Sequence, residues 1–392
     1  MLSNRVNLIK PSPTIAVSNR AKELKDAGHD VIGLGAGEPD FDTPDHIKQA
    51  AIDAIQNGDT KYTAVDGTPQ LKKAIIDKLK NENGFDYNAK QILVSCGAKH
   101  SLFNVFQALI GPGDEAIIPA PYWVSYPDMV KLCEGTPVIV DCKIDNQFRM
   151  TAEQLEQAIT DKTKLLVLCS PSNPSGSAYS EAELAALGTI LAKHPQITVV
   201  TDDIYEHILW TDKPFVNILN ASPELYDQTV VINGVSKVFA MTGWRIGYAA
   251  GPEKLIGAMK KIQSQSTSNP CSIAQAASAA ALSGDQSCIT DMVRNFKERH
   301  DYVVDRLSNI KGVKVIPSDG TFYTFPDFSQ AIADSEVDND VDYAALLLEK
   351  AGVALVPGSA FGSEGHLRIS YATDMDTLKN ALDRIETFAN QA

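Results

Sequence analysis

Residues 229–250 decide how the fold is interpreted, and they read TVVINGVSKVFAMTGWRIGYAA. The two ends of this stretch, residues 229–232 and 245–250, are short apolar runs with the length of a buried strand. Because the second run follows the first closely, we expect one of the two strands to lie antiparallel to its neighbours. A loop of small residues between them carries Lys237.

Similar apolar runs recur upstream and alternate with segments of helical spacing. Leu102, Val105, Phe106 and Leu109, for example, fall on one face of a helix. Strands separated by helices indicate βαβ units, so we expect an α/β large domain with a mainly parallel, seven-stranded sheet covered by helices. The five upstream runs are residues 91–96, 115–119, 136–141, 164–169 and 196–201.

The C-terminal part has a different pattern and predicts a smaller α+β domain of about 100 residues. We expect the chain to divide into an N-terminal segment (1–33), a large ligand-binding domain (34–288) and this small domain (289–392). The N-terminal segment should pack with the small domain or with a partner subunit. The small domain is predicted to hold helices over 289–308, 343–351 and from 375 onward, and strands over 312–316, 321–325 and 366–370.

Composition limits the classes of function. The chain has 392 residues, 44% hydrophobic and 21% charged, which is typical of a globular protein. Its net charge of −14 and its scattered basic residues argue against nucleic acid or anionic lipid as partners. No apolar run has the length of a membrane helix or the form of a signal sequence. Six widely spaced cysteines and seven histidines without ligand spacing predict a reduced, cytoplasmic enzyme with no metal site.

The residues with chemical potential follow the predicted strands, where open α/β sheets bind their ligands. Lys237 comes after the run 229–232, and Arg245 follows eight residues later. A lysine nucleophile beside an anion-binding arginine suits a covalent link to a phosphorylated aldehyde cofactor. The alternative is an ordinary solvated lysine in a surface loop.

Asp202 and Tyr205 follow the run 196–201. A carboxylate at the buried mouth of a sheet needs a cationic partner, which a protonated pyridine nitrogen would supply. Asp202 is equally suited to cap the next helix. Tyr205 has the chemistry to donate a hydrogen bond to a phenolate oxygen of the cofactor, and its alternative is a core tyrosine.

Three further strand ends complete the set. Gly97, Ala98 and Lys99 lie at a strand-to-helix turn whose backbone N–H groups suit a phosphate. Asn173 follows the run 164–169 and offers an amide to a ring oxygen. Arg368, in the predicted strand 366–370, either faces solvent or clamps a substrate carboxylate bidentately.

These residues, in this order, resemble the class I/II aminotransferases of the type I pyridoxal-phosphate fold, and in particular the bacterial-type aspartate aminotransferases. The resemblance extends over nearly the whole chain. Its motifs are AGEPDF (36–41), KY (61–62), PYWVSYP (121–127), the Asn173-Pro174 turn, Asp202 with Tyr205, Ser236-Lys237, GWRIGY (243–248) and Arg368.

The resemblance implies a homodimer with shared active sites and pyridoxal 5'-phosphate as cofactor. It implies that Lys237 binds the cofactor aldehyde and shuttles a proton, and that Arg368 clamps the substrate α-carboxylate beside Gly37. The implied cofactor contacts are Asp202 at the pyridine nitrogen, Tyr205 and Asn173 at the phenolic oxygen, Trp123 on the ring, and Ser236, Arg245, Gly97, Ala98 and Lys99 at the phosphate, with Tyr62 contributed by the partner subunit.

The implied reaction moves the amino group of L-aspartate to 2-oxoglutarate, giving oxaloacetate and L-glutamate. By the same resemblance Lys99 binds the substrate's side-chain carboxylate, and Lys10 accompanies secondary use of prephenate. Trp123 and Asn173 also contact the substrate. Two departures from the family pattern are Gly234, where many relatives have Ser, and Ser175 in place of the common Thr.

Other interpretations stay open at the level of sequence. An aminotransferase for aromatic or varied amino acids, or a lyase or synthase on the same fold, would use the same cofactor residues. Residues 33–38 (GLGAGE) mimic a dinucleotide fingerprint but lack its last glycine, and Pro39 opposes the helix that should follow. A non-catalytic ligand-binding module is opposed by the presence of Lys237 and its proposed partners.

Overall fold

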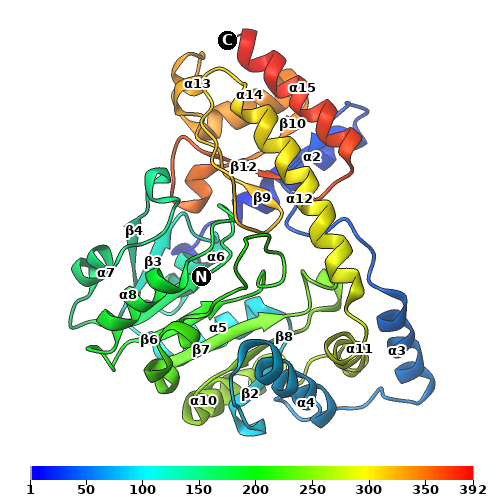
Figure 1. The fold of residues 1–392 in the computed structure, drawn as a ribbon, viewed down its shortest axis with the longest axis vertical. Helices are drawn as coiled ribbons and strands as arrows, with labels where there is room; N and C mark the ends of the chain where they lie inside the picture. The colour runs from blue at the N-terminus through cyan, green and yellow to red at the C-terminus, as the bar shows by residue number, and fades with distance from the viewer. Residues whose placement is uncertain (1, 392) are drawn as a thin grey trace.

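The computed structural model describes residues 2–391, and a seven-stranded sheet forms its centre (Figure 1). The strand order is β2-β8-β7-β6-β5-β3-β4. Only β8 is antiparallel to both of its neighbours, which confirms the mainly parallel sheet and the single reversed strand expected near its end. The strands are β2 (Ile92–Ser95), β3 (Glu115–Ala120), β4 (Thr136–Asp141), β5 (Thr163–Cys169), β6 (Thr198–Asp202), β7 (Thr229–Gly234) and β8 (Gly247–Ala250).

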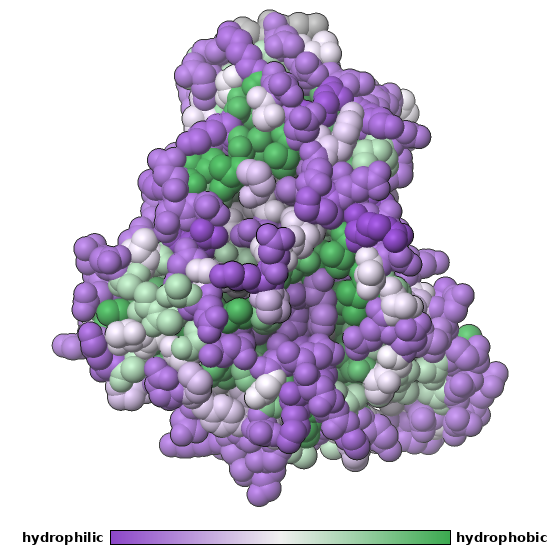
Figure 2. All heavy atoms as spheres, viewed as in Figure 1, coloured by the Kyte–Doolittle hydropathy of each residue, from purple (hydrophilic) through white to green (hydrophobic). Residues whose placement is uncertain are grey.

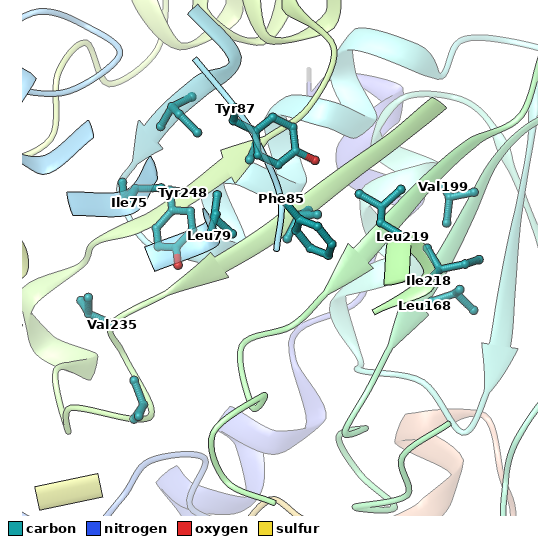
Figure 3. Packing of buried hydrophobic residues seen from close by; sticks show 14 of the residues in the cluster. Ile75, Leu79, Phe85, Tyr87, Leu168, Val199, Ile218, Leu219, Val235 and Tyr248 are labelled. Atoms are coloured by element: carbon teal, nitrogen blue, oxygen red, sulfur yellow. The ribbon is translucent and has the colours of Figure 1, made fainter. Parts of the chain in front are cut away.

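Helices cover both faces of this sheet because successive strand residues point to opposite sides. In β2, Leu93 packs into one hydrophobic cluster, whereas Ile92 and Val94 pack into the other. Figure 3 shows part of the second cluster, where Tyr248 of β8 and Val199 of β6 take part. The first face is covered by α5 (Ala98–Leu109), α6 (Ser125–Leu132) and α10 (Glu253–Ser264), and the second by α3 (Asp45–Gln56), α4 (Pro69–Lys78), α7 (Ala152–Ala158), α8 (Glu181–Leu191), α9 (Ile218–Ala221) and α11 (Ser272–Ser283).

The C-terminal part forms its own core above the sheet in Figure 1. A three-stranded antiparallel sheet in the order β11-β12-β9 lies at its centre. Its helices are α12 (Ser287–Ser308), α13 (Ser329–Ala333), α14 (Asp340–Ala351) and α15 (Met375–Gln391), and its strands are β9 (Tyr323–Thr324), β10 (Val353–Ala354), β11 (Val356–Pro357) and β12 (Leu367–Ser370).

The N-terminal segment lies against this C-terminal part. After a short α1 (Asn4–Asn7), helix α2 (Pro13–Asp26) places Ala21 beside Val31 and Ala354, and β1 (Ile32–Gly33) pairs in parallel with β10. Within α12, Cys288 packs on the sheet's core, whereas Met292 belongs to the C-terminal core. The division of the chain at 33 and 288 stays a prediction.

Two predicted strands of the small domain are wrong in extent. Residues 312–316 form no strand, and Lys314 makes only an isolated bridge with Asp327. The predicted strand 321–325 shrinks to the two residues of β9. Within 312–316 the backbone turns back on itself, since Val313 donates to Ile310 O at 3.2 Å. Before β9 the chain bonds to loops of the large part instead of a neighbouring strand: Asp319 donates to Gly176 O at 3.0 Å and Thr321 to Ile208 O at 2.8 Å.

The surface seen in Figure 2 is largely hydrophilic, with small apolar areas between polar ones. Among residues 2–391, no helix combines the length and the apolar character required to traverse a bilayer. The glycine-rich residues 33–38 run from the end of β1 into an extended segment, and α3 begins only at Asp45. The chain there lacks the strand-to-helix turn that a dinucleotide fingerprint requires.

Candidate active site

A cavity of about 410 Å³ opens at the carboxyl ends of β5, β6 and β7, between the sheet and the C-terminal part. Residues from both parts and from α2 line it. Most of the residues predicted from sequence are brought together here: Gly37, Ala98, Lys99, Trp123, Asn173, Asp202, Tyr205, Ser236, Lys237, Arg245 and Arg368.

Lys237 lies half-buried in the loop after β7, so the interpretation as a solvated surface lysine is wrong. Its Nζ donates a hydrogen bond to Gly37 O at 2.5 Å. Burial lowers the pKa of Lys237 to about 8, and the positive charges of Arg368 and Arg245 contribute to the decrease. A much larger fraction of this amine is therefore neutral and nucleophilic near physiological pH than of an ordinary lysine.

Asp202 is the last residue of β6 and is buried. Tyr126 on α6 donates a hydrogen bond to its Oδ2 at 2.6 Å, whereas its Oδ1 has no partner among residues 2–391. Burial raises the pKa of Asp202, and the Tyr126 hydrogen bond and the Lys237 charge act against that increase. A turn, not a helix, follows Asp202, so the helix-cap interpretation is wrong. A buried carboxylate oxygen without a partner suits a cationic donor in the cavity.

Tyr205 lies in the turn after β6, lines the cavity and also belongs to the C-terminal core. Its hydroxyl lies 3.2 Å from that of Tyr323. Burial raises the pKa of Tyr205 well above its ordinary value, so the phenol keeps its proton. Lys237 Nζ is 6.0 Å from the centre of the Tyr205 ring. Tyr205 is thus a core residue that also lines the cavity, and its contact with a cofactor oxygen stays a prediction.

An anion cradle lies where α5 begins. Gly97 precedes α5 with a φ of +87°, and a Cβ on it would lie 2.4 Å from Nη2 of Arg245. A Cβ on Gly247 would lie 2.1 Å from Ala98 N, so both glycines are required for this close approach. The backbone N–H groups of the first turn of α5, the guanidinium and nearby Ser236 form a site typical of phosphate binding. Gly234 has no side chain and therefore offers no hydroxyl to this site. A Cβ at this position would lie 2.9 Å from Ile246 O.

Arg368 on β12 is buried, which excludes the solvent-facing alternative. It donates to Asn173 Oδ1 at 2.9 Å and to Gly35 O at 2.8 Å, and its guanidinium lies 4.3 Å from the centre of the Tyr323 ring. Its Nε has no hydrogen-bond partner, and no carboxylate pairs with it in the described chain. A buried cation without a counter-ion, facing a cavity, suits a carboxylate ligand.

Lys99 lies at the exposed rim of the cavity, with Nζ 4.8 Å from the centre of the Trp123 ring. Partial burial and the Arg245 charge lower the pKa of Lys99. No carboxylate lies within ion-pair distance of Lys99 in the part of the chain that is described. Its charge is thus available to a ligand near the Trp123 ring.

Three predicted residues do not line the cavity of this chain. Gly97 borders it through the contact with Arg245. Tyr62 is 93% exposed in the loop before α4, and Lys10 is exposed before α2. The roles that the resemblance implies for Tyr62 and Lys10 stay predictions.

Sequence reasoning gave no role to several residues of the site. Tyr126 lies within the motif 121–127, three residues after Trp123. This spacing could have indicated that both side chains lie on the same side of a helix. Tyr323 was hidden in a predicted strand. Nothing in the sequence pointed to the α2 residues that reach the cavity. The unpredicted lining residues include Thr14, Ile15 and Ser18 of α2, Cys169 at the end of β5, and Glu38 and Thr242.

A half-buried lysine, a buried carboxylate with an unpaired oxygen and a glycine-lined turn beside an arginine lie around one α/β cavity. Residues 29–385 match the family described as aminotransferase class I and II. The chain belongs to this family.

Individual relatives and solved structures are similar to this chain over nearly its full length. The chain is 57% identical to the aspartate/prephenate aminotransferase of Nitrosomonas europaea, with 98% of each chain covered, and 53% identical to that of Cereibacter sphaeroides, covering 99% of this chain and 98% of the other. Among solved structures, the aspartate aminotransferase of Rhizobium meliloti superposes with a TM-score of 0.96 at 49% identity, covering 100% and 99% of the chains. That of Thermus thermophilus with maleate superposes at 0.92 and 41% identity, covering 99% of each.

The lowered pKa of Lys237 predicts an unusual reactivity. In ligand-free protein the neutral amine should be the major form above pH 8, so acetylation of Lys237, followed by mass spectrometry, should reach half its maximal rate near pH 8. Arg368→Met should move this midpoint upward, because it removes a neighbouring positive charge. A wild-type midpoint near pH 10 would show that burial does not perturb this amine.

Proposed function

We propose that this protein is a pyridoxal-phosphate-dependent aspartate aminotransferase. It moves the amino group of L-aspartate reversibly to 2-oxoglutarate, giving oxaloacetate and L-glutamate. The observation that carries the proposal is the convergence of Lys237, Asp202 and Arg368 on one cavity. A nucleophilic amine, a carboxylate with a free buried oxygen and an unpaired guanidinium are the groups that this reaction requires.

The residues of the cavity fit pyridoxal 5'-phosphate. The free Oδ1 of Asp202 suits the protonated ring nitrogen, and the glycine-lined cradle beside Arg245 suits the phosphate. Trp123, Asn173, Tyr205 and Ser236 also line the cavity. In this proposal Trp123 would cover the ring, Asn173 and Tyr205 would contact its oxygen, and Ser236 would bind the phosphate. When bound, this cofactor delocalises the electron pair that remains on the substrate α-carbon after its proton is removed.

Each residue then has a distinct task. Arg368 binds the substrate α-carboxylate and thereby orients the α-carbon, in a pocket that Gly37 borders. Lys237 Nζ would accept the α-proton of the substrate and hold it for return, a base role for which a pKa of about 8 is suitable. Asp202 keeps the proton on the ring nitrogen, because a buried carboxylate favours a cationic neighbour. Release of the keto acid and entry of a second keto acid complete a ping-pong cycle.

Lys99 is assigned to the side-chain carboxylate of the acidic substrate. Its unpaired charge at the rim of the cavity supports this role. The Thermus relative is described in complex with maleate, a dicarboxylate, and the relatives from Nitrosomonas and Cereibacter are named for both aspartate and prephenate. We include prephenate as a second amino-group acceptor, with Lys10 as its candidate contact. The competing function is an aminotransferase of broader or aromatic specificity.

The protein is further proposed to act in the cytoplasm as a homodimer with shared active sites. Tyr62 is 93% exposed, and Ile52 and Ile55 on α3 are also largely exposed apolar residues. These exposed apolar residues suit an interface through which Tyr62 reaches the partner's phosphate site. The six cysteines are all free, which suits a reducing compartment.

The proposed role of Lys237 is tested by Lys237→Ala. This variant should lower transamination of aspartate with 2-oxoglutarate by at least about a thousandfold, because it removes the base and the covalent anchor together. Oxaloacetate, glutamate and ammonia are measured in the same assay. Turnover that persists in Lys237→Ala refutes the role of this lysine, and ammonia release by the wild type in place of glutamate identifies a lyase.

The proposed role of Lys99 predicts a selective loss. Lys99→Ala should lower kcat/KM for aspartate by about tenfold to a hundredfold, because a charge-assisted contact to the side-chain carboxylate is lost. For an apolar amino acid such as leucine, the change should stay within about threefold. Lys254→Ala, on the exposed side of α10, is the matched control and should leave both values unchanged. An equal loss for both substrates would contradict the assignment.

A further inference from the structure

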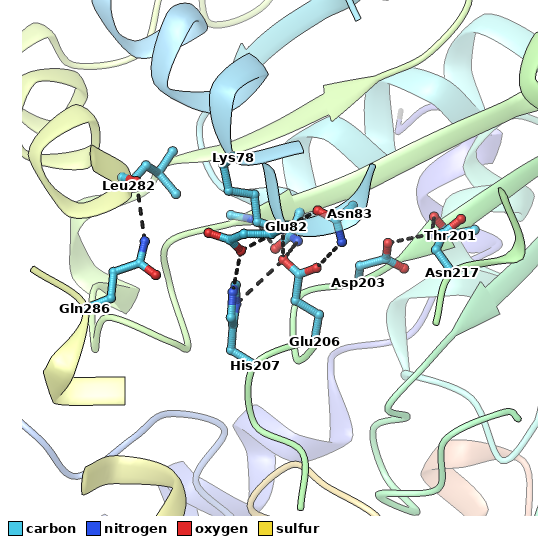
Figure 4. Close-up of polar contacts among 12 residues, drawn as sticks. Lys78, Glu82, Asn83, Thr201, Asp203, Glu206, His207, Asn217, Leu282 and Gln286 are labelled. Atoms are coloured by element: carbon cyan, nitrogen blue, oxygen red, sulfur yellow. Dashed lines mark hydrogen bonds and ion pairs between the residues drawn. The ribbon is translucent and has the colours of Figure 1, made fainter. Parts of the chain in front are cut away.

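A polar cluster with a buried centre lies around Glu206, the residue that follows Tyr205 in the turn after β6 (Figure 4). We call it the Glu206 cluster. None of its members is among the residues that line the cavity, so no step of the proposed reaction uses them. The members are Lys78, Glu82, Asn83, Glu206, His207 and Asn233.

Glu206 is the centre of this cluster. Its Oε1 makes a close ion pair with Lys78 Nζ and accepts a hydrogen bond from Asn233 Nδ2 at 2.6 Å. Its Oε2 accepts a hydrogen bond from Asn83 Nδ2 at 2.9 Å. The side chains of Lys78 and Glu206 are 1% and 5% exposed, so water competes little for these contacts.

The cluster joins two segments of the active site. Glu206 immediately follows Tyr205, whereas Asn233 lies on β7, three residues before Ser236 and four before Lys237. A single carboxylate therefore fixes the turn with Asp202 and Tyr205 against the strand end that leads to the lysine. A backbone bond from Asp203 N to Ile232 O, 2.9 Å long, supports the same junction.

The charge at the centre is a protein cation and not a metal. Carboxylate and imidazole atoms of Glu82, Glu206 and His207 lie close enough together to suggest a metal site. However, Lys78 Nζ contacts Glu206 and lies 3.6 Å from Glu82 Oε2, so an ammonium already occupies this position. Burial alone would raise the pKa of Glu206, but the Lys78 charge and the surrounding hydrogen bonds bring the pKa below its ordinary value.

Stability is a weak explanation for such a pair. Removing two charges from water costs about as much as their attraction returns, and well-packed apolar residues of similar volume often serve stability equally well. A buried pair whose hydrogen bonds reach two active-site segments is better explained by the geometry that it imposes on them.

We propose that Glu206, neutralised by Lys78, is a positioning residue of the aminotransferase site that holds Asp202 and Tyr205 in place relative to Lys237. This inference rests on the proposed function, because the distance between these groups matters only if they act on one bound cofactor. Glu206 acts through Tyr205 and Asn233 and touches no reacting atom.

The test compares Lys78→Met, Glu206→Met and the double variant in the cofactor-loaded protein. Three quantities are measured: the Tm, the midpoint pH of the bound cofactor's visible absorption, and kcat and KM for aspartate. Each single variant should lose Tm because the buried charge that remains loses its closest counter-charge. Each should also lose about tenfold to a hundredfold in kcat and shift the absorption midpoint by about half a pH unit or more.

The double variant separates positioning from stability. Its Tm should return close to the wild-type value, whereas the lowered kcat and the shifted midpoint should persist because Asn233 and the Tyr205 turn remain unlinked. Arg306→Met is the matched control, since it breaks an ion pair between α12 and α15 that is remote from the cavity. It should lower Tm without moving the midpoint.

Two results would overturn the inference. One is a double variant in which kcat and midpoint recover together with Tm, and the other is a set of folded variants with an unchanged midpoint. If the single variants fail to fold, the double variant alone decides. Failure of the proposed function is distinguishable, because wild-type protein would then bind the cofactor without converting aspartate, while the midpoint could still be compared among variants.

Discussion

The hydrogen-bonded register of β5, β6 and β7 is the constraint on which the site depends. Cys169 is aligned with Asp202, and Asp202 with Ile232, so three chain segments leave the sheet side by side. Each then turns into a loop that supplies a functional group, because parallel strands present their carboxyl ends at one edge. A shift of one residue in β6 would turn Asp202 away from the cavity and leave its carboxylate inside the apolar core.

The second feature of the site is an unbalanced set of buried charges. Arg368 and Lys237 bring positive charge into a cavity that Asp202 also lines, and Arg368 and Asp202 each keep one buried polar atom without a hydrogen-bond partner. Protein alone leaves these groups partly unsatisfied, which costs free energy of folding. A ligand that carries carboxylate, phosphate and a protonated ring nitrogen would satisfy all of them, so stability and binding are coupled.

The seven-stranded sheet could be predicted from the sequence because most of its strands are short apolar runs, which are typical of buried strands. The polar residues that follow these runs predicted the edge of the sheet at which the cavity lies. Arg368 was recognisable as an arginine inside an apolar run. The hydrogen bond between Tyr126 and Asp202 could not be predicted from the sequence, because the two residues are 76 positions apart and the packing of α6 brings them together. The strand predicted at 312–316 failed because Val313 N bonds back to Ile310 O and Lys314 pairs only with Asp327, contacts that no local pattern reports.

The most direct test of the account is the visible absorption of the purified protein, reconstituted with pyridoxal phosphate, before and after L-aspartate is added alone. The account predicts a visible band that bleaches with aspartate and returns when 2-oxoglutarate is supplied, because the two half-reactions use the same cavity in turn. A band that aspartate leaves unchanged would contradict the assigned substrate. The absence of any band would contradict the role of Lys237 and, with it, the proposed site.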